Sequence, residues 1–169
     1  MGTSDITHQA IWEVSTAKTG TSVKNLIDTR LDTFWQSNSG VPHFITGYFN
    51  YRRNICAVEL YVHYGIDDTY TPKIVVVRVG DHVDCLETVG EFTLSAPIGW
   101  VKLRLEPMYY LSKVIQQLPD TPEAALASTL MRESSRQGFS CSIIQIGILA
   151  NFQNGQDSHV RQVKVLEQC

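Results

Sequence analysis

The chain has 169 residues, of which 43% are hydrophobic and 18% charged, and its formal net charge is -3. This is enough apolar material for a single domain over residues 1–169, and the acidic balance excludes non-specific binding to a nucleic-acid backbone. No apolar stretch approaches the roughly 20 residues of a membrane span, so we expect a soluble monomeric domain, cytoplasmic or nuclear, that contacts neither membrane nor nucleic acid.

Short segments of alternating or continuous apolar character recur along the chain and predict β-strands. In chain order they are Ala10–Val14, His43–Phe49, Ile55–His63, Lys73–Val79, Glu91–Leu94, Gly99–Leu105, Cys141–Ala150 and Arg161–Leu166. Lys102 and Arg104 share one face of their segment, as expected for a strand with one packed and one wet side. Many short strands separated by Gly, Pro and Asn turns predict an all-β sandwich or barrel.

Two segments depart from this β pattern. Lys24–Leu31 predicts a short helix near the N-terminus. Residues 106–139 predict a partly helical insertion, because Thr121-Pro122-Glu123 combines a cap, a proline at the first helical position and an early carboxylate. An irregular segment of this length inside a compact domain is either functional or disordered. The β core then spans about residues 11–166.

The cysteines and histidines indicate neither a metal site nor a cofactor. The 4 cysteines form no C-x-x-C pair, and the 5 histidines lack the spacing of ligands. Cys56 and Cys141 lie inside apolar runs, where a free thiol behaves as a small hydrophobe, so we expect reduced, intracellular cysteines. Asp67-Asp68 could offer oxygen atoms to calcium, but a solvated acidic turn is favoured because the D-x-D-x-D-G pattern is absent.

The most polar stretch is Asn151–Arg161, between two predicted strands. One interpretation is a hairpin loop turned by Asn154-Gly155. The other is a recognition loop, because a tight hairpin needs only about two loop residues and this longer loop offers donors and acceptors for a peptide backbone and a charged side chain. Asp157, Ser158 and His159 predict no hydrolase triad, since neighbouring residues point apart. We therefore expect no catalytic residue.

The tryptophans Trp12, Trp35 and Trp100 are of a residue type that more often packs in a core or at its rim than binds a ligand. Trp35 is the exception, because Asp32–Ser37 places it between polar groups in a predicted loop. A loop aromatic flanked by Gln36 and Ser37 favours recognition over burial.

Several short motifs occur in a defined order along the chain. They are Asp32–Ser37, Pro42-His43, Tyr70–Pro72, Val77–Gly80, Gly99-Trp100, Ile144–Ile146, Leu149–Asn151 and Gln153–Lys164. Together, from about Ile11 to Val165, they resemble the Doc domain of multi-subunit and giant ubiquitin ligases, and the last motif is the most specific. The resemblance implies a jelly-roll β-sandwich, similar to galactose-binding domains, without enzymatic activity.

The resemblance also implies where and what the domain binds. In the anaphase-promoting complex, the Doc subunit helps to capture degron-bearing substrates, so we expect a substrate- or partner-recognition domain of an E3 ubiquitin ligase that binds a peptide or degron through loops at one end of the sandwich. The expected contact residues are Trp35, Gln36, Ser37, Tyr70, Thr71, Pro72, Asn151, Gln153, Asn154, Gly155, Asp157, His159 and Arg161. The alternatives are a carbohydrate-binding, lectin-like module and a scaffold domain that docks other subunits.

Some positions depart from the family pattern. Pro72 passes directly to Lys73, where the family usually has an intervening serine, and Gln156 replaces a basic residue. The loops thereby lose a hydroxyl and a positive charge near the expected destruction-box site. The long insertion and the final residues Glu167–Cys169, which lack the Ile-Arg tail of the stand-alone subunit, lead us to expect a larger parent ligase of the HECT or cullin type.

Overall fold

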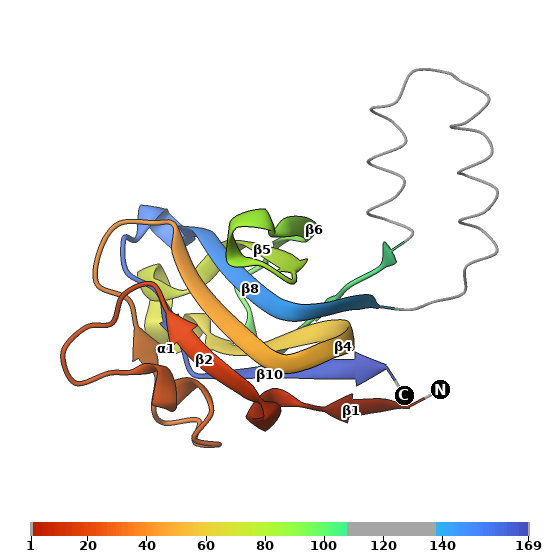
Figure 1. Ribbon diagram of the computed structural model, residues 1–169. Coiled ribbons are helices and arrows are strands. Elements are labelled where there is room, and N and C mark those ends of the chain that lie inside the picture. The colour runs from red at the N-terminus through yellow and green to blue at the C-terminus, as the bar shows by residue number, and fades with distance from the viewer. Residues whose placement is uncertain (1, 108–137, 169) are drawn as a thin grey trace, which may run out of the picture.

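One bent strand, β4 (His43–His63), belongs to both layers of the fold. Its first half pairs with β2 (Ala10–Val14) on one side and with β8 (Phe139–Asn151) on the other. Its second half pairs with β10 (Gln162–Gln168) and β7 (Ile98–Arg104). This computed structural model describes residues 2–107 and 138–168 (Figure 1).

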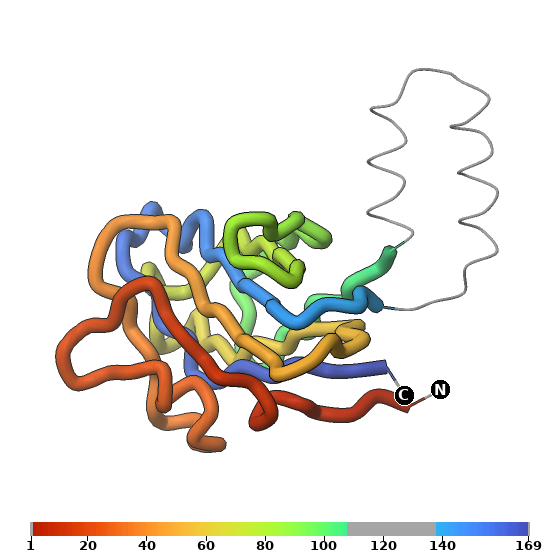
Figure 2. The backbone as a smooth tube through the Cα atoms, viewed as in Figure 1, coloured from red at the N-terminus to blue at the C-terminus, as the bar shows by residue number. Residues whose placement is uncertain are grey.

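Each half of β4 is the centre of an antiparallel sheet. In the first layer, β8 continues through β5 (Pro72–Gly80) to β6 (Glu87–Thr93). In the second layer, β1 (Thr3–Asp5) covers the outer edge of β10. This two-layer arrangement, visible as crossing tubes in Figure 2, confirms the all-β sandwich expected from the sequence.

The core lies between the two layers and is filled by alternate residues of the strands. Fully buried side chains include Val58, Leu60 and Val62 of β4, Val75 and Val77 of β5, and Ile144, Ile146 and Ile148 of β8. These β-branched and aliphatic residues suit a pleated, half-buried surface. Burial of each contributes roughly 1.5–3 kcal/mol, so the strands form a rigid support for the loops.

Short helical turns connect the strands. They are η1 (Thr7–Gln9), η2 (Val23–Leu26), α1 (Tyr64–Asp67), η3 (Asp68–Tyr70), η4 (Val83–Cys85) and η5 (Phe152–Asn154). The expected helix at Lys24–Leu31 is only the 3-10 turn η2, where Ser22 and Asn25 form a capping box. Within the described ranges, no helix is long and apolar enough to cross a membrane.

The structure differs from the strand predictions in two ways. The segments His43–Phe49 and Ile55–His63 form one continuous strand. The polar stretch between them stays in the sheet, because pairing with β8 resumes at Arg53 after a register shift. Three short strands were not predicted: β1, β3 (Trp35–Gln36) and β9 (His159–Val160). Most of the predicted insertion 106–139 lies outside the described residues.

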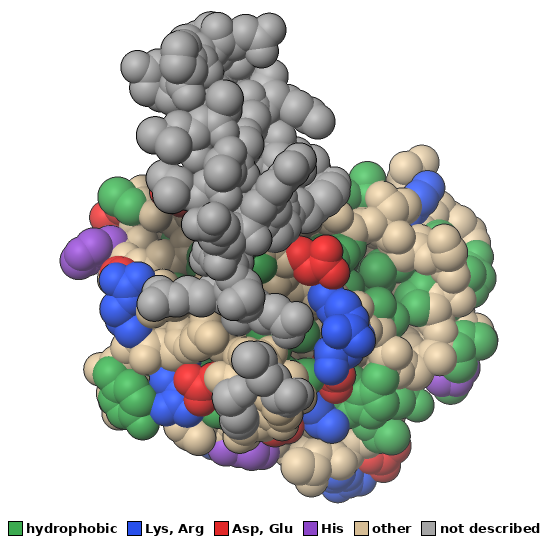
Figure 3. Space-filling model, turned by 90° about the vertical axis from the view of Figure 1, so that its right-hand side faces the viewer, with side chains coloured by type: hydrophobic (Ala, Val, Ile, Leu, Met, Phe, Trp, Pro, Cys, Tyr) green, Lys and Arg blue, Asp and Glu red, His purple; other side chains and the backbone are tan. Residues whose placement is uncertain are grey.

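The two ends of the sandwich differ. Figure 1 shows the start of β1, the end of β10 and the start of β8 at one end, and α1, η5 and the start of β4 at the opposite end. Figure 3 views the first of these ends, where charged side chains of both signs are interspersed. Arg52 pairs with Asp81 there, and Arg53 with Glu167.

Candidate functional site

The small sheet β3–β9 joins two of the segments that the sequence singled out. Trp35 lies opposite Val160, and Gln36 lies opposite His159. Beyond the strands, the Ser158 backbone N–H donates to Ser37 Oγ at 2.8 Å, and the Ser37 N–H donates to the Ser158 carbonyl at 3.1 Å. The loop before β4 and the loop before β10 are therefore fixed to each other.

The third segment, which contains α1 and η3, is hydrogen-bonded to η5. The Phe152 N–H donates to the Thr71 carbonyl at 3.0 Å, and Gln153 Nε2 donates to Asp68 Oδ1 at 2.7 Å. A Cβ at Gly155 would overlap the Thr69 carbonyl oxygen, so only glycine permits this close approach. All three predicted segments thus meet at one end of the sandwich.

Three rings form a continuous stack at this end. The ring of His159 lies between the rings of Tyr70 and Phe34, with centroid distances of 4.2 Å on both sides. The Arg161 guanidinium lies over the Phe34 ring, 5.5 Å from its centroid. Because both neighbours are nearly parallel to the imidazole, at 13° and 22°, the stack fixes the orientation of the Tyr70 ring.

A buried carboxylate, Asp67, lies beside the stack and contacts His159 and Arg161. Arg161 Nε donates to Asp67 Oδ2 at 3.0 Å and Nη2 donates to Oδ1 at 2.7 Å, while His159 Nδ1 lies 3.2 Å from Oδ1. Burial raises the pKa of Asp67, but the hydrogen bonds from His159 and Arg161 and the charge of Arg161 outweigh it, so the pKa lies below the ordinary value. Asp67 is therefore ionised at neutral pH and compensates the Arg161 charge.

The sequence matches the model of a known protein family over almost its whole length. The family model for "Anaphase-promoting complex, subunit 10 (APC10)" matches residues 1–168. The chain belongs to the subunit 10 family. Similar curated proteins are subunit 10 of Homo sapiens, 30% identical over 95% of this chain and 73% of that protein, and subunit 10 of Dictyostelium discoideum, 31% identical over 95% and 71%. The Doc resemblance inferred from the motifs is thereby confirmed.

Solved structures similar to this subunit 10 family member show the fold. A family 32 carbohydrate-binding module of Clostridium perfringens NanJ, in complex with galactose, has a TM-score of 0.69 and 9% identity, covering 98% of this chain and all of that one. A fucolectin from Morone saxatilis has a TM-score of 0.66 and 8% identity over 98% of this chain and 48% of its own. The galactose-binding-like jelly roll expected from the sequence is confirmed, and the comparison says nothing of the ligand.

The burial of the predicted contact residues separates a supporting set from an exposed set. Those that are buried are Trp35, Gln36, Ser37, Thr71, Pro72, Asn151, His159 and Arg161. Those that reach the surface are Tyr70, Gln153 and Asn154, with Gly155 and Asp157 half-buried. A ligand outside the domain meets the second set, whereas the first set holds the loops in place.

Trp35 is a correction to the sequence analysis. It is 0% exposed, packs in the core and donates from Nε1 to the Thr16 carbonyl at 2.8 Å. Gln36 and Ser37, the neighbours that suggested an exposed loop aromatic, are themselves buried. Gln36 Nε2, for example, donates to Asp157 Oδ2 at 3.3 Å. The expectation that Trp35 is an exposed recognition residue is therefore wrong.

Asn151 and its neighbours correct the expectation that the last loop is wholly water-facing. Asn151 Nδ2 donates to the carbonyls of Gly155 and Asp157 at 3.0 and 2.9 Å, and Asn151 Oδ1 accepts from Ser158 Oγ at 2.8 Å. These bonds brace the turn internally. Two interpretations were left open for this loop. The hairpin interpretation describes its buried side, whereas Gln153 and Asn154 are exposed and available for recognition.

Sequence reasoning missed three members of the site: Phe34, Asp67 and Asp68. Asp67-Asp68 was interpreted as a solvated turn, yet Asp67 is 5% exposed and only Asp68 is solvated. One signal was available, because His159 and Arg161 are two residues apart beside a predicted strand and so lie on the same face. A buried arginine on that packed face predicts a carboxylate partner.

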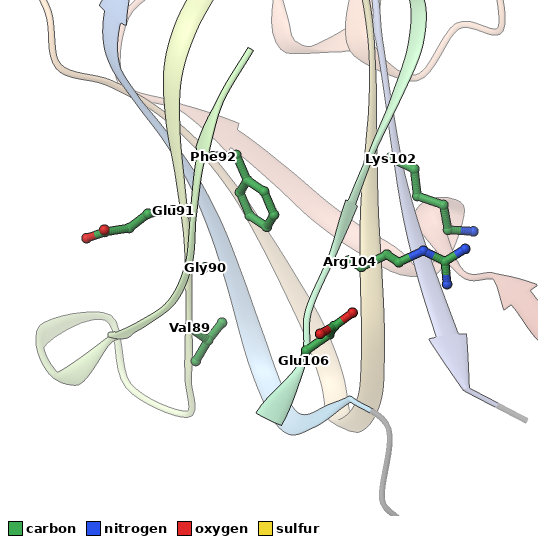
Figure 4. Close-up of a pocket in the computed structure, with 7 residues that line it drawn as sticks. All are labelled: Val89, Gly90, Glu91, Phe92, Lys102, Arg104 and Glu106. Atoms are coloured by element: carbon green, nitrogen blue, oxygen red, sulfur yellow. The ribbon is translucent and has the colours of Figure 1, made fainter. Parts of the chain in front are cut away.

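Two hollows lie away from this site. One, of about 320 Å³, lies between the edge strands β6 and β7 and is lined by Val89, Gly90, Glu91, Phe92, Lys102, Arg104 and Glu106 (Figure 4). The other, of about 250 Å³, lies beside Phe49 and Arg53. Neither contains a predicted contact residue. In the part of the chain that is described, no group of His, Cys, Asp and Glu is arranged to hold a metal ion.

Proposed function

We propose that this chain is a substrate-recognition module of a ubiquitin ligase, and that it binds an extended polypeptide through η3 and η5. Membership in the subunit 10 family supports a place in the anaphase-promoting complex. It also agrees with a binding domain that is not itself an enzyme. The observation that carries the proposal is a set of exposed residues, Tyr70, Gln153 and Asn154, which we call the rim. The rim is supported by the buried ion pair of Asp67 and Arg161.

The rim is suited to a polypeptide because it is preorganised. Gln153 and Asn154 have φ of 51° and 58°, so two of the three rim residues hold left-handed backbone, and Asp68, two residues before Tyr70, also has a positive φ of 38°. Such conformations cost about 1–3 kcal/mol each and persist only where the surroundings determine them. A ligand that binds here meets amides and a ring already in position, which reduces the entropy lost on binding.

The chemistry of the rim fits a peptide backbone. The side-chain amides of Gln153 and Asn154 each provide donors and an acceptor, and the Tyr70 ring provides an apolar face. Peptide amides in an extended ligand need both kinds of partner, while one side chain of the ligand supplies the anchor. The galactose-bound module and the fucolectin share only the fold, at 9% and 8% identity, so they give no support to a lectin function.

A display experiment tests the proposal. A phage library of random 12-residue peptides is selected on the domain and on the double variant Gln153→Gly, Asn154→Gly. Glycine removes both amides but keeps the left-handed backbone. Asn50→Gly, which removes an exposed amide at the register shift of β4 between Tyr48 and Arg53, is the control. We expect peptides that bind the native domain and the control but lose at least tenfold in affinity on the double variant.

Two results would overturn the proposal. In one, selected peptides bind the double variant as well as they bind the native domain. In the other, no peptide is enriched and a glycan array gives a signal, which would favour the lectin-like alternative. The recognition of a degron and the cytoplasmic or nuclear location belong to this proposal as predictions, whereas relatives named as subunits of the anaphase-promoting complex favour that complex over the HECT- or cullin-type parent ligase expected from the sequence.

A further inference from the structure

The strand β7 leaves one edge of the sandwich open. Within the described part of the chain, β4 is the one strand that pairs with β7, so the other side of β7 has no strand partner there. The Leu105 N–H donates to the Cys56 carbonyl at 2.9 Å, which fixes the direction of the neighbouring peptide groups. Because hydrogen-bonding directions alternate along an antiparallel strand, the backbone N–H and C=O groups of Lys102 and Arg104 face the open edge.

The open edge borders the larger of the two hollows. This hollow, of about 320 Å³, lies between β7 and β6, the edge strand of the other layer. Val89 is buried and Phe92 half-buried, and Figure 4 shows both side chains extending from β6 toward β7. The ring of Phe92 lies against Gly90, where a Cβ would come within 2.6 Å of it. The floor of the hollow is therefore apolar.

The outer face of β7 is basic where the hollow opens. Lys102 and Arg104 are exposed and, in Figure 4, extend away from β6. Lys102 Nζ lies 3.4 Å from Glu59 Oε1, whereas no carboxylate of the described ranges pairs with Arg104. Glu106, two residues further along, is exposed and limits the positive charge to these two positions.

Two copies of this chain are poorly suited to pair with each other through β7. Antiparallel pairing of two identical edges would bring Lys102 and Arg104 of one copy close to the same residues of the other. Like charges opposite each other destabilise a sheet, and lysine on an edge strand protects against self-association. The occupant that fits this edge is therefore a different polypeptide, with carboxylates where the edge has cations.

We propose that the open edge of β7 binds an extended polypeptide segment, which adds to the sheet as a further strand. Successive side chains of a strand point to opposite faces. Ligand residues opposite Lys102 and Arg104 therefore lie on the basic outer face, and the ligand residue between them points into the hollow. The recognised segment is thus alternately acidic and apolar. This surface goes beyond the proposed function, because it includes no residue of the rim.

Hydrogen exchange measured by nuclear magnetic resonance tests the proposal on the whole chain. The probe is the capped peptide acetyl-Thr-Val-Glu-Val-Glu-Val-Thr-amide, whose terminal threonines keep a carboxylate away from Glu106. One control peptide carries lysine in place of both glutamates. The other keeps the glutamates but is methylated at the backbone nitrogens of its three central residues, so that it cannot complete a strand ladder.

The expected result is a pattern that alternates along β7. At a saturating concentration of the glutamate peptide, exchange of the Lys102 and Arg104 amides should slow by about fivefold or more, because both gain an acceptor. Exchange of the Leu103 amide, which faces β4, should change little. Neither control peptide should slow exchange at Lys102 or Arg104.

Charge reversal at one position supplies the variant. Arg104→Glu leaves the pair of Lys102 and Glu59 in place and should weaken binding of the glutamate peptide about five- to tenfold, since an attractive cross-strand pair becomes repulsive. The same variant should bind the lysine peptide more tightly than the native chain does. Lys18→Glu, which makes the same change in net charge at an exposed lysine in the loop after β2, is the matched control and should bind as the native chain does.

Several results would overturn the proposal. They are equal affinity for the glutamate and lysine peptides, unaltered binding of the methylated peptide, or slowed exchange that spares Lys102 and Arg104. No binding of the glutamate peptide would also overturn it, and would leave the two cations as protection of the edge against self-association.

The rim provides an independent reference. The double variant Gln153→Gly, Asn154→Gly should bind the glutamate peptide normally, and Arg104→Glu should bind peptides selected from the display library normally. Loss of one kind of binding without the other therefore shows which of the two functions fails.

Discussion

Arg161 donates hydrogen bonds to both carboxylate oxygens of Asp67, from Nη2 at 2.7 Å and from Nε at 3.0 Å, and both side chains are buried. Arg161 stands between β9 and β10, and Asp67 ends α1, so this ion pair ties the last loop to the turn that carries the rim. Arg161 Nη1 also donates to the Leu31 carbonyl at 3.0 Å, which adds the loop before β3. The pair therefore joins all three segments of the candidate site.

Removal of the Asp67 carboxylate should be strongly destabilising. Asp67→Ala leaves the Arg161 guanidinium buried without compensation, and breaking a buried pair in this way costs about 3–5 kcal/mol. Urea unfolding measures the loss. Asp68→Asn, one residue along but exposed, should leave the unfolding midpoint almost unchanged. Equal effects of the two substitutions would contradict the assignment of Asp67 as the structural carboxylate.

The same carboxylate should make stability depend on acid. Because the pKa of Asp67 in the folded chain lies below its ordinary value of 3.8, its contribution to stability is fully present above that value and is lost as pH falls through the folded pKa. We expect the free energy of unfolding to fall as the pH drops below the ordinary aspartate value of 3.8. Asp67→Asn should show a smaller fall over that range than the native chain, and an identical pH profile would contradict the account.

Gly155→Ala should damage the rim more than the core. The added methyl group would meet the Thr69 carbonyl, so η5 and η3 must move apart and their hydrogen bonds weaken. Binding of selected peptides should fall at least tenfold, with a smaller change in melting temperature than Asp67→Ala causes. Gly2→Ala is the control, because a Cβ there meets no atom within 4 Å. Unchanged peptide binding by Gly155→Ala would show that the hydrogen bonding of η3 to η5 is dispensable.

Trp35→Phe should behave as a core substitution. It leaves the Thr16 carbonyl without its indole donor and opens space in the core, with an expected loss of about 1–3 kcal/mol. Peptide affinity, measured below the unfolding transition, should change little. A large loss of affinity at unchanged stability would restore Trp35 as a contact residue.

The cysteines should differ in reactivity. Burial raises the pKa of the Cys141 thiol to about 12, so little thiolate forms at pH 8, and the side chain is inaccessible. Cys85 is exposed. Iodoacetamide labelling of the native chain, followed by peptide mapping, should therefore modify Cys85 quickly and Cys141 only after unfolding. Rapid labelling of Cys141 in the native chain would contradict the packing of β8.

The regular part of the fold could be predicted from the sequence because it depends on local periodicity. Ala10–Val14 is a strand with the bounds that its apolar pattern predicts. By contrast, β3 and β9 are two residues each and exist only because they pair across the chain. No local pattern distinguishes such strands from loops, since their stability comes from a non-local partner.

The sequence predicted which segments form the candidate site, but not which of their side chains are buried and which are exposed. The motifs identified Trp35, Tyr70 and the stretch after Asn151, which the fold does bring together. Which side of each loop faces inward depends on a buried carboxylate, Asp67, from a segment that looked solvated. Sequence periodicity is weakest in loops, so this division into a buried base and an exposed rim required the structure.

Hydrogen–deuterium exchange of the domain, with and without a peptide selected from the display library, tests the central claim most directly. The account predicts that bound peptide slows exchange at residues 68–70 and 152–157, at the end of the sandwich that carries α1 and η5. Protection confined to the outer face of β10, β4 and β7, with no change at the rim, would contradict it and favour a docking function of the sheet.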